Sequence, residues 1–306
     1  MPEATVVPAH LAHTVGVWTA SLEAVPASRA QELAAQIEEL GYTTLWFGEA
    51  YGREAFSFAS LLLAGTGTLA AATGIASIYA RDAVTANAAA RTVAEAYPGR
   101  FALGLGVSHK PIVERVRGHE YRTPMADMTA YLAAMDAAPY MAVGPEASPP
   151  RLLAALGPKM LDLARDAADG AHPYQVTPEH THMARERLGA GKILAVEQAV
   201  VLTDDEEVAM ARAHAHLDIY TGLPNYRNNW RRLGFGEEDF VRGGSDRLAR
   251  AMVVWGDEVT IAARVQEHFA AGADHVCIQA LGDDVFTVPG DQWRRLAPAL
   301  IPAERP

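Results

Sequence analysis

The chain has 306 residues, and half of them are apolar, which is enough to bury a large core. Its formal net charge of −11 argues against a surface that binds nucleic acid, because such a surface needs a basic face. A single cysteine, Cys277, excludes an internal disulfide and is typical of a reducing compartment. Neither a secretory leader nor the run of roughly 18 apolar residues that a membrane span needs is recognisable, so we expect a cytoplasmic protein without nucleic-acid or membrane partners.

The first half of the chain alternates short apolar runs, typical of buried strands, with longer segments of helical period. Ser28 and Gln31 have the spacing of a capping box, Gly41 is a typical helix end, and Asp82 is a typical helix cap. Strands are predicted at 15–19, 43–49, 71–79 and 101–107, and helices at 28–41, 55–70 and 82–97.

The second half continues the same alternation. Pro178 follows Thr177 as a favourable helix start, and Gly272 ends a helix whose Ile261, Val265 and Phe269 share a face. Strands are predicted at 151–156, 169–174, 192–202 and 273–281, and helices at 158–168, from 178, over 204–219 and from 257.

Eight strands, nearly all followed by a helix, predict a parallel sheet with right-handed crossovers. Eight such units favour a closed (β/α)8 TIM barrel over an open doubly wound sheet. Two connections are long, 109–150 and 203–257, and the second predicts a helical insertion between strands seven and eight. We expect residues 1–306 to form a single domain of the α/β class.

The candidate site follows from this fold, because TIM barrels carry their active sites at the carboxyl ends of the strands. Glu49 is a candidate proton donor or cofactor contact, although acidic residues at strand ends are often only solvated. His172 is a candidate ligand contact, whereas Glu197 lies inside a strand and is expected to be structural. The residues at the predicted strand ends are Trp18, Glu49, Ser77, Tyr79, Arg81, Ser108, His109, Lys110, Gly157, Lys159, His172, Tyr174 and Gln279.

The fourth strand, within "GRFALGLGVSHKP" (99–111), contains two glycines where a buried strand normally has side chains. Gly104 and Gly106 weaken the strand, and glycine at such positions usually marks the close approach of a backbone or a ligand. The strand ends in three polar residues, Ser108, His109 and Lys110, and the pattern alone leaves open whether the glycines accommodate a backbone or a ligand.

Lysine is scarce, with three residues against twenty-three arginines, and two of the three lysines follow strands. "LGPKM" places Gly157 at a strand-to-helix turn, with Pro158 first in the helix. Backbone N–H groups at a helix start bind phosphate, and Lys110 and Lys159 would add charge. The alternative is that Gly-Pro merely starts a helix and that the lysines lie there by chance.

A metal site is not expected. His180 and His182 lie two residues apart, as do His214 and His216, which on a helix places each pair on different faces. The chain has no H-E-x-x-H motif, no P-loop and no complete G-x-G-x-x-G motif, since "GLGVSH" lacks the third glycine.

Five segments in order resemble the bacterial luciferase-like family, and more narrowly its oxidoreductases that depend on the deazaflavin coenzyme F420. They are "LAAQIEELGYTTLWFGE", "ATGIASIYARD", "AYPGRFALGLGVSH", "LLAALGPKMLDLARDAADGAHPY" and "GADHVCIQAL". "PNYRNNWRRLGF", in the long connection after strand seven, adds to the resemblance, which covers almost the whole chain.

The resemblance implies a luciferase-like TIM barrel with the deazaflavin ring across the strand ends and, commonly, a homodimer formed by helices beside strands two and three. It implies a bulge with a non-prolyl cis peptide at Gly74, Ile75 and Ala76, a cofactor loop at Gly106 to His109 and a phosphate cradle at Leu156 to Met160. On this resemblance Gly104 and Gly106 would clear space for a phosphorylated cofactor that Ser108, His109 and Lys110 face. Glu49, His109 and His172 are the expected catalytic residues. The expected cofactor contacts are Trp18, Gly74, Ile75, Ala76, Ser77, Gly106, Val107, Ser108, Lys110, Leu156, Gly157, Pro158, Lys159 and Met160.

The expected activity is hydride transfer between the deazaflavin C5 and a small organic substrate. Two alternatives remain open: a luciferase-like monooxygenase that uses reduced FMN and O2, and a paralogue that binds a flavin or deazaflavin without turnover. The histidine and tryptophan that follow strand two in relatives that oxidise sugar phosphates are absent here, where the strand ends in "GEAY" (48–51).

Overall fold

The computed structural model describes residues 7–301; residues 1–6, part of the start searched for a leader, and 302–306 lie outside the described residues. Eight parallel strands form a closed barrel, because β10 pairs with both β1 and β8. The strands are β1 (Thr14–Trp18), β2 (Thr44–Phe47), β3 (Ala70–Thr73), β5 (Phe101–Gly106), β6 (Arg151–Leu153), β7 (Gly170–Ala171), β8 (Ile193–Leu202) and β10 (His275–Ala280).

The predicted (β/α)8 barrel is therefore confirmed, with two additions to its sheet. The two-residue strand β4 (Ala76–Ser77) follows β3 after a break at Gly74 and Ile75 and pairs with β5. The strand β9 (Val253–Gly256) lies in the insertion and extends the sheet beside the second half of β8.

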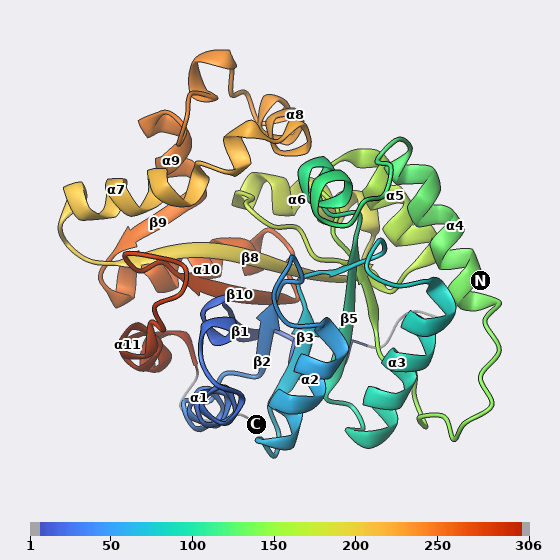
Figure 1. Ribbon diagram of the computed structural model, residues 1–306. Coiled ribbons are helices and arrows are strands. Elements are labelled where there is room, and N and C mark those ends of the chain that lie inside the picture. Colours follow the sequence, from blue (N-terminus) through green and yellow to red (C-terminus); the bar gives the residue numbers. More distant parts are fainter. Residues whose placement is uncertain (1–6, 302–306) are drawn as a thin grey trace.

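Helices surround the barrel (Figure 1). In chain order they are α1 (Ala27–Glu39), α2 (Ala55–Ala64), α3 (Ala83–Ala96), α4 (Pro124–Asp136), α5 (Pro158–Ala167), α6 (Pro178–Leu188), α7 (Glu206–Leu217), α8 (Pro224–Arg232), α9 (Asp246–Met252), α10 (Glu258–Ala270) and α11 (Gly290–Leu300). Short 3-10 turns are η1 (Ala9–Leu11), η2 (Ser21–Ala24), η4 (Tyr220–Gly222) and η5 (Glu237–Asp239), and η3 (Ile112–Val116) is a π-helical turn.

The helix-end signals of the sequence were confirmed in part. The Asp82 carboxylate accepts from Thr85 N–H, Thr177 accepts from His180 N–H, and Gly41 ends α1 with a φ of +89°. The Ser28 and Gln31 capping box is wrong: α1 starts directly after Pro26 and has no side-chain cap. Gln31 instead donates to the Leu61 carbonyl of α2, at 2.9 Å.

The predicted insertion between the seventh and eighth barrel strands is present as α7, η4, α8, η5 and α9. Figure 1 shows α7, α8 and α9 grouped at one side of the barrel, next to β8 and β9. A separate apolar cluster holds this group together and includes Leu217, Tyr226, Trp230 and Leu248.

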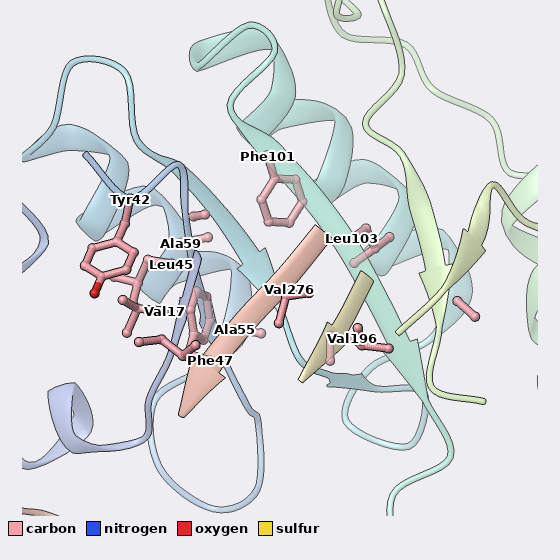
Figure 2. Close-up of a cluster of buried hydrophobic side chains, with 14 of the residues drawn as sticks. Val17, Tyr42, Leu45, Phe47, Ala55, Ala59, Phe101, Leu103, Val196 and Val276 are labelled. Carbon is pink, nitrogen blue, oxygen red and sulfur yellow. The ribbon is translucent and has the colours of Figure 1, made fainter. Parts of the chain in front are cut away.

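Successive strand residues point alternately into the barrel and toward the helices. The outward residues form the main core with the helices, and Figure 2 shows Val17, Leu45 and Phe47 of β1 and β2 in this layer. The inward residues form a second cluster around Trp46, with alanine at several positions: Leu11, Trp18, Trp46, Ala72, Ala102, Leu152, Ile193, Ala195 and Cys277. This alternation decides which strand-end residues can face a ligand in the barrel mouth.

Among residues 7–301, no helix is both long enough and apolar enough to cross a membrane.

Candidate functional site

Small residues line one half of the barrel mouth. Trp46, Ala72, Ala102 and Leu152 point into the barrel from β2, β3, β5 and β6. The next inward positions toward the carboxyl end of each of these strands are glycine or alanine. We call this half the shelf. It comprises Gly48, Gly74, Gly104, Gly106 and Ala154, together with Ile75, whose side chain packs over the glycines of β5. Gly48, Gly74, Ile75 and Ala154 are partly exposed, so the shelf is open to a ligand.

Of the two roles that the sequence left open for the strand glycines, the structure shows the close approach of another segment of the chain rather than direct space for a ligand. A Cβ on Gly104 would lie 1.9 Å from the Thr73 carbonyl oxygen, and a Cβ on Gly106 would lie 2.5 Å from Ile75 Cγ1. Both glycines therefore make room for the neighbouring chain at the break between β3 and β4, and only indirectly for a ligand. The Gly74–Ile75 peptide bond at this break is cis, as the resemblance implied.

Polar and aromatic side chains line the other half of the mouth, which we call the polar half: Trp18, His172, Tyr174, Glu197 and Gln279. They come from β1, β8, β10 and the residues after β7. Trp18 Nε1, His172 Nε2 and Glu197 Oε1 are buried and have no hydrogen-bond partner among the described residues. Buried polar atoms are rarely left unpaired, so this concentration indicates a site that a polar ligand completes.

His172 is the one expected catalytic residue that the structure brings into the mouth. Its Nδ1 donates to the Ala195 carbonyl at 2.9 Å, which leaves Nε2 as an acceptor. Burial lowers the pKa of His172 to about 4, so the ring is neutral at pH 7. Its ring stacks on Trp46, with centroids 4.2 Å apart, and Nε2 would lie 2.9 Å from a Cβ on Gly74.

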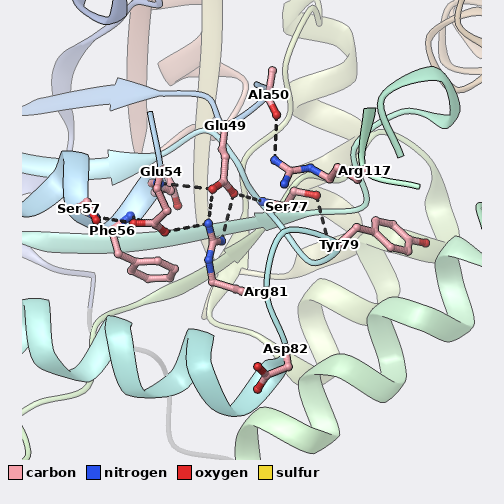
Figure 3. A network of polar contacts seen from close by, with 12 residues as sticks. Glu49, Ala50, Glu54, Phe56, Ser57, Ser77, Tyr79, Arg81, Asp82 and Arg117 are labelled. Carbon is pink, nitrogen blue, oxygen red and sulfur yellow. Dashed lines mark hydrogen bonds and ion pairs between the residues drawn. The ribbon is translucent and has the colours of Figure 1, made fainter. Parts of the chain in front are cut away.

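Glu49 points away from the mouth, because it is one position out of phase with the inward Trp46 and Gly48. Figure 3 shows its carboxylate paired with Arg81 and accepting from Ser77 N–H. Ala55 N–H also donates to it, at 3.3 Å, and Arg81 is shared with Glu54 at 2.8 Å. Glu49 thus joins β2, β4 and α2, and its carboxylate lies on the helix side of the barrel wall rather than in the mouth.

The network around Glu49 lines a hollow of about 980 Å³ between α2 and α3. Its lining includes Tyr51, Tyr79, Arg81 and Arg117, and none of Trp18, Gly74 or His172. This hollow is therefore separate from the mouth.

The segment after β5 lies at the rim of the mouth. Ser108 has a φ of +53°, and the His109 ring lies 5.8 Å from that of Tyr226 on α8, so the insertion reaches this rim. Burial lowers the pKa of His109 to about 4. Val107 packs at the edge of the core, and Lys110 is exposed and lies 3.8 Å from Glu114, within its own segment.

The turn from β6 into α5 has the predicted form. Gly157 is the residue before the helix and supplies no side-chain cap, and Pro158 is the first helical residue. Lys159 is exposed, whereas Leu156 and Met160 pack against the core. The structure thus brings one of the two expected lysines to the helix start, and the other, Lys110, pairs with Glu114.

Arg232, at the end of α8, is a cation that sequence reasoning missed at this turn. Its guanidinium nitrogens lie 3.3 and 3.5 Å from the position of a Cβ on Gly157. Within residues 7–301 its guanidinium makes no hydrogen bond or ion pair. Burial lowers the pKa of the His180 ring, and the nearby charge of Arg232 lowers it further. A free guanidinium over an uncapped helix start is an arrangement that suits phosphate.

The remaining predicted residues support the shelf. Ala76 and Ser77 form β4 and are buried, and Ser77 binds Glu49 rather than facing the mouth.

No group of His, Cys, Asp or Glu side chains in the part of the chain that the structure describes could hold a metal ion. Sequence reasoning had named every residue of the polar half as a strand-end residue except Glu197, which the inward alternation of β8 past Ile193 and Ala195 would have identified.

Comparison with known proteins agrees with this architecture. The model of the luciferase-like monooxygenase family matches residues 7–275. A Mycobacterium tuberculosis protein (strain ATCC 25618 / H37Rv) provisionally named coenzyme F420-dependent oxidoreductase Rv3520c is 27% identical over 289 residues, covering 80% of this chain and 79% of its own.

Two solved structures share the fold at low identity. An F420-dependent secondary alcohol dehydrogenase in complex with an F420–acetone adduct matches with a TM-score of 0.76 at 14% identity, covering 94% of this chain and 99% of its own. The EDTA monooxygenase EmoA from Chelativorans sp. BNC1 matches with a TM-score of 0.72 at 11% identity, covering 94% and 93%.

Proposed function

This chain belongs to the luciferase-like monooxygenase family, and we propose that within it the protein is a coenzyme F420-dependent oxidoreductase that transfers a hydride between the deazaflavin C5 and a small organic substrate. The observation that carries the proposal is the divided mouth. The shelf would support a flat ring, the polar half would face its reacting edge, and the start of α5 would bind a phosphate. The F420-dependent relative and structural neighbour support the same assignment.

The residues present fit such a cofactor. Gly74, Ile75 and Val107 would support the ring, and Gly157, Lys159 and Arg232 would bind the phosphate tail. The bound coenzyme supplies the hydride chemistry, which no side chain can perform.

The protein's own residues position and shield the reacting atoms. Trp18 Nε1 offers a hydrogen-bond donor and the neutral His172 ring offers an acceptor, both already desolvated. Because they are fixed by packing against Gly74 and Trp46, they need no reorganisation when the ligand binds. Tyr220 and Tyr226, from the insertion, cover the polar half and exclude water.

The first experiment is a fluorescence titration of the apo-protein with F420 and, separately, with FMN. We expect saturable binding of F420 and much weaker binding of FMN. Binding of FMN alone would overturn the F420 assignment, and binding of neither would overturn any flavin-dependent function.

A luciferase-like monooxygenase that uses reduced FMN and O2 is the second candidate, and the match to EDTA monooxygenase favours it. It predicts O2 consumption that requires reduced FMN and this protein together. F420-dependent turnover without O2 consumption would exclude it.

A further inference from the structure

Glu197 of β8 is a buried carboxyl group with half of its hydrogen-bonding capacity unused. The side chain is 1% exposed and lies inside the barrel, in register with Cys277 of β10. Its Oε2 accepts from the Gln175 backbone N–H at 3.0 Å. Its Oε1 has no partner in the described part of the chain.

The groups packed around Glu197 are all neutral. The titratable side chains near it are Tyr174 after β7, Tyr220 of η4, Tyr226 of α8 and Cys277 of β10. With no cation facing the carboxyl, burial raises the pKa of Glu197 to about 8. Because Oε2 accepts the Gln175 hydrogen bond, the proton of the acid belongs on the unpartnered Oε1.

A hydrogen-bonded array connects the surroundings of Glu197 to the rim. Tyr220 donates to the Tyr174 hydroxyl at 3.1 Å, and Tyr174 donates to Gln279 Oε1 at 2.7 Å. Gln279 lines a hollow of about 90 Å³ at the rim, together with His216. His216 in turn contacts the side chain of Gln175, whose backbone binds Glu197. The carboxyl is therefore enclosed by side chains whose hydrogen bonds extend to the hollow at the rim.

We propose that Glu197 is the proton donor of this enzyme, delivering the Oε1 proton to the oxygen of a carbonyl substrate held in the polar half. This inference rests on the proposed function. As the carbonyl carbon accepts the hydride, the electron pair of the C=O π bond moves to oxygen, which takes the Oε1 proton. The product is an alcohol, Glu197 is left as a carboxylate, and a proton from solvent restores it.

The assignment also names the substrate class as small aldehydes and ketones. An acid kept protonated near neutral pH donates to an oxygen acceptor, and Trp18 Nε1–H offers a second donor on the same side of the mouth. Tyr174, Tyr220 and Tyr226 pack against one another beside the carboxyl, with neighbouring ring centroids 5.5 and 4.8 Å apart, and such a packed aromatic wall favours small substrates.

The test compares wild type with Glu197→Gln, which keeps the size and the Oε2-like acceptor but removes the acidic proton. Glu207→Gln, an exposed position on α7, is the matched control. Infrared spectroscopy of the protein alone should show the C=O band of a protonated carboxylic acid at pH 7. The band should persist in Glu207→Gln, vanish in Glu197→Gln and disappear from wild type as the pH rises past about 8. Its absence from wild type at pH 7 would overturn the proposal.

The kinetic arm measures oxidation of reduced F420 by a series of small aldehydes and ketones. We expect kcat to fall about 100-fold in Glu197→Gln, with F420 affinity and KM nearly unchanged and Glu207→Gln equal to wild type. Unchanged kcat in Glu197→Gln would overturn the donor role, and turnover of no carbonyl compound by wild type would overturn the substrate class. Failure of wild type to bind F420 would instead refute the proposed function, and the infrared result would stand by itself.

Discussion

Glu49 and His172 both follow buried strands, yet they lie on opposite sides of the barrel wall. His172 is in phase with the inward alternation and faces Gly74, whereas Glu49 is out of phase and binds Arg81 among the helices. Position at a strand end therefore does not suffice to assign a catalytic residue. The parity of the position within the strand decides which side the residue faces.

At the residue scale, Gly104→Ala should destabilise the protein by about 1–3 kcal/mol, because its Cβ would meet a backbone carbonyl that cannot move freely. Chemical denaturation measures the loss. Gly290→Ala is the control, since a Cβ there meets nothing within 4 Å at the start of α11. Equal stability of the two variants would contradict the close approach of Thr73 to Gly104.

Buried histidines predict a loss of stability in acid. Burial lowers the pKa of His172 and His180 to about 4 and of His268 to about 3, against 6.5 when exposed. Below pH 6.5 the unfolded chain binds protons that the folded chain refuses, so the free energy of unfolding falls as the pH drops from 6.5 toward 4. The raised pKa of Glu197 has the opposite effect: it makes the free energy of unfolding fall as the pH rises above 4.5. It is one group, however, against several histidines.

Urea denaturation at pH 7 and pH 5 checks this prediction. We expect a lower free energy of unfolding at pH 5, and a smaller pH effect in His268→Gln. His182→Gln, at an exposed position, should behave as wild type. A stability that does not change between the two pH values would contradict neutral histidines in the folded state.

At the element scale, α8 places Arg232 over the start of α5 and Tyr226 beside His109. The two ends of this nine-residue helix thus reach two neighbouring strand ends, and it acts as one wall of the mouth. We predict that Arg232→Ala weakens F420 binding roughly three- to tenfold, because it removes one charge-assisted contact to phosphate.

Arg231→Ala is the matched control for Arg232→Ala. It removes the same charge one residue away, where the side chain pairs with Glu237 instead of facing Gly157. Equal effects of Arg231→Ala and Arg232→Ala would indicate general charge attraction rather than a phosphate contact.

Lys159→Ala should weaken F420 binding with little loss of stability, since the lysine is exposed.

At the scale of the whole molecule, the hollow between α2 and α3 raises the question of oligomeric state. The resemblance implies a dimer formed by helices beside strands two and three, but the apolar side chains of α2 mostly pack inward: Phe58, Leu62 and Leu63 are buried against the barrel. The exposed apolar side chains at the hollow are Tyr51, at 77%, and Val116, at 56%. We propose that a second copy of the chain covers them.

Light scattering after size-exclusion chromatography tests the dimer. Wild type should have twice the mass of one chain, and Val116→Glu should shift it toward the monomer. Val259→Glu, at a position on α10 that is also exposed, should have no effect. A monomeric wild type would contradict the proposal and leave the barrel and its mouth unaffected.

By itself, the sequence determined the alternation of eight strands and helices, and with it the closed barrel, because hydrophobic period and helix-end residues act over a few positions. It also identified the β6–α5 turn and, through resemblance, the break at Gly74 and Ile75. Only the tertiary structure decided that Gly104 and Gly106 receive a neighbouring strand, that Arg232 reaches Gly157 from another element, and that Glu197 is left half-unpaired. These properties depend on contacts between segments far apart in the chain, and no local pattern encodes which side chain arrives opposite which.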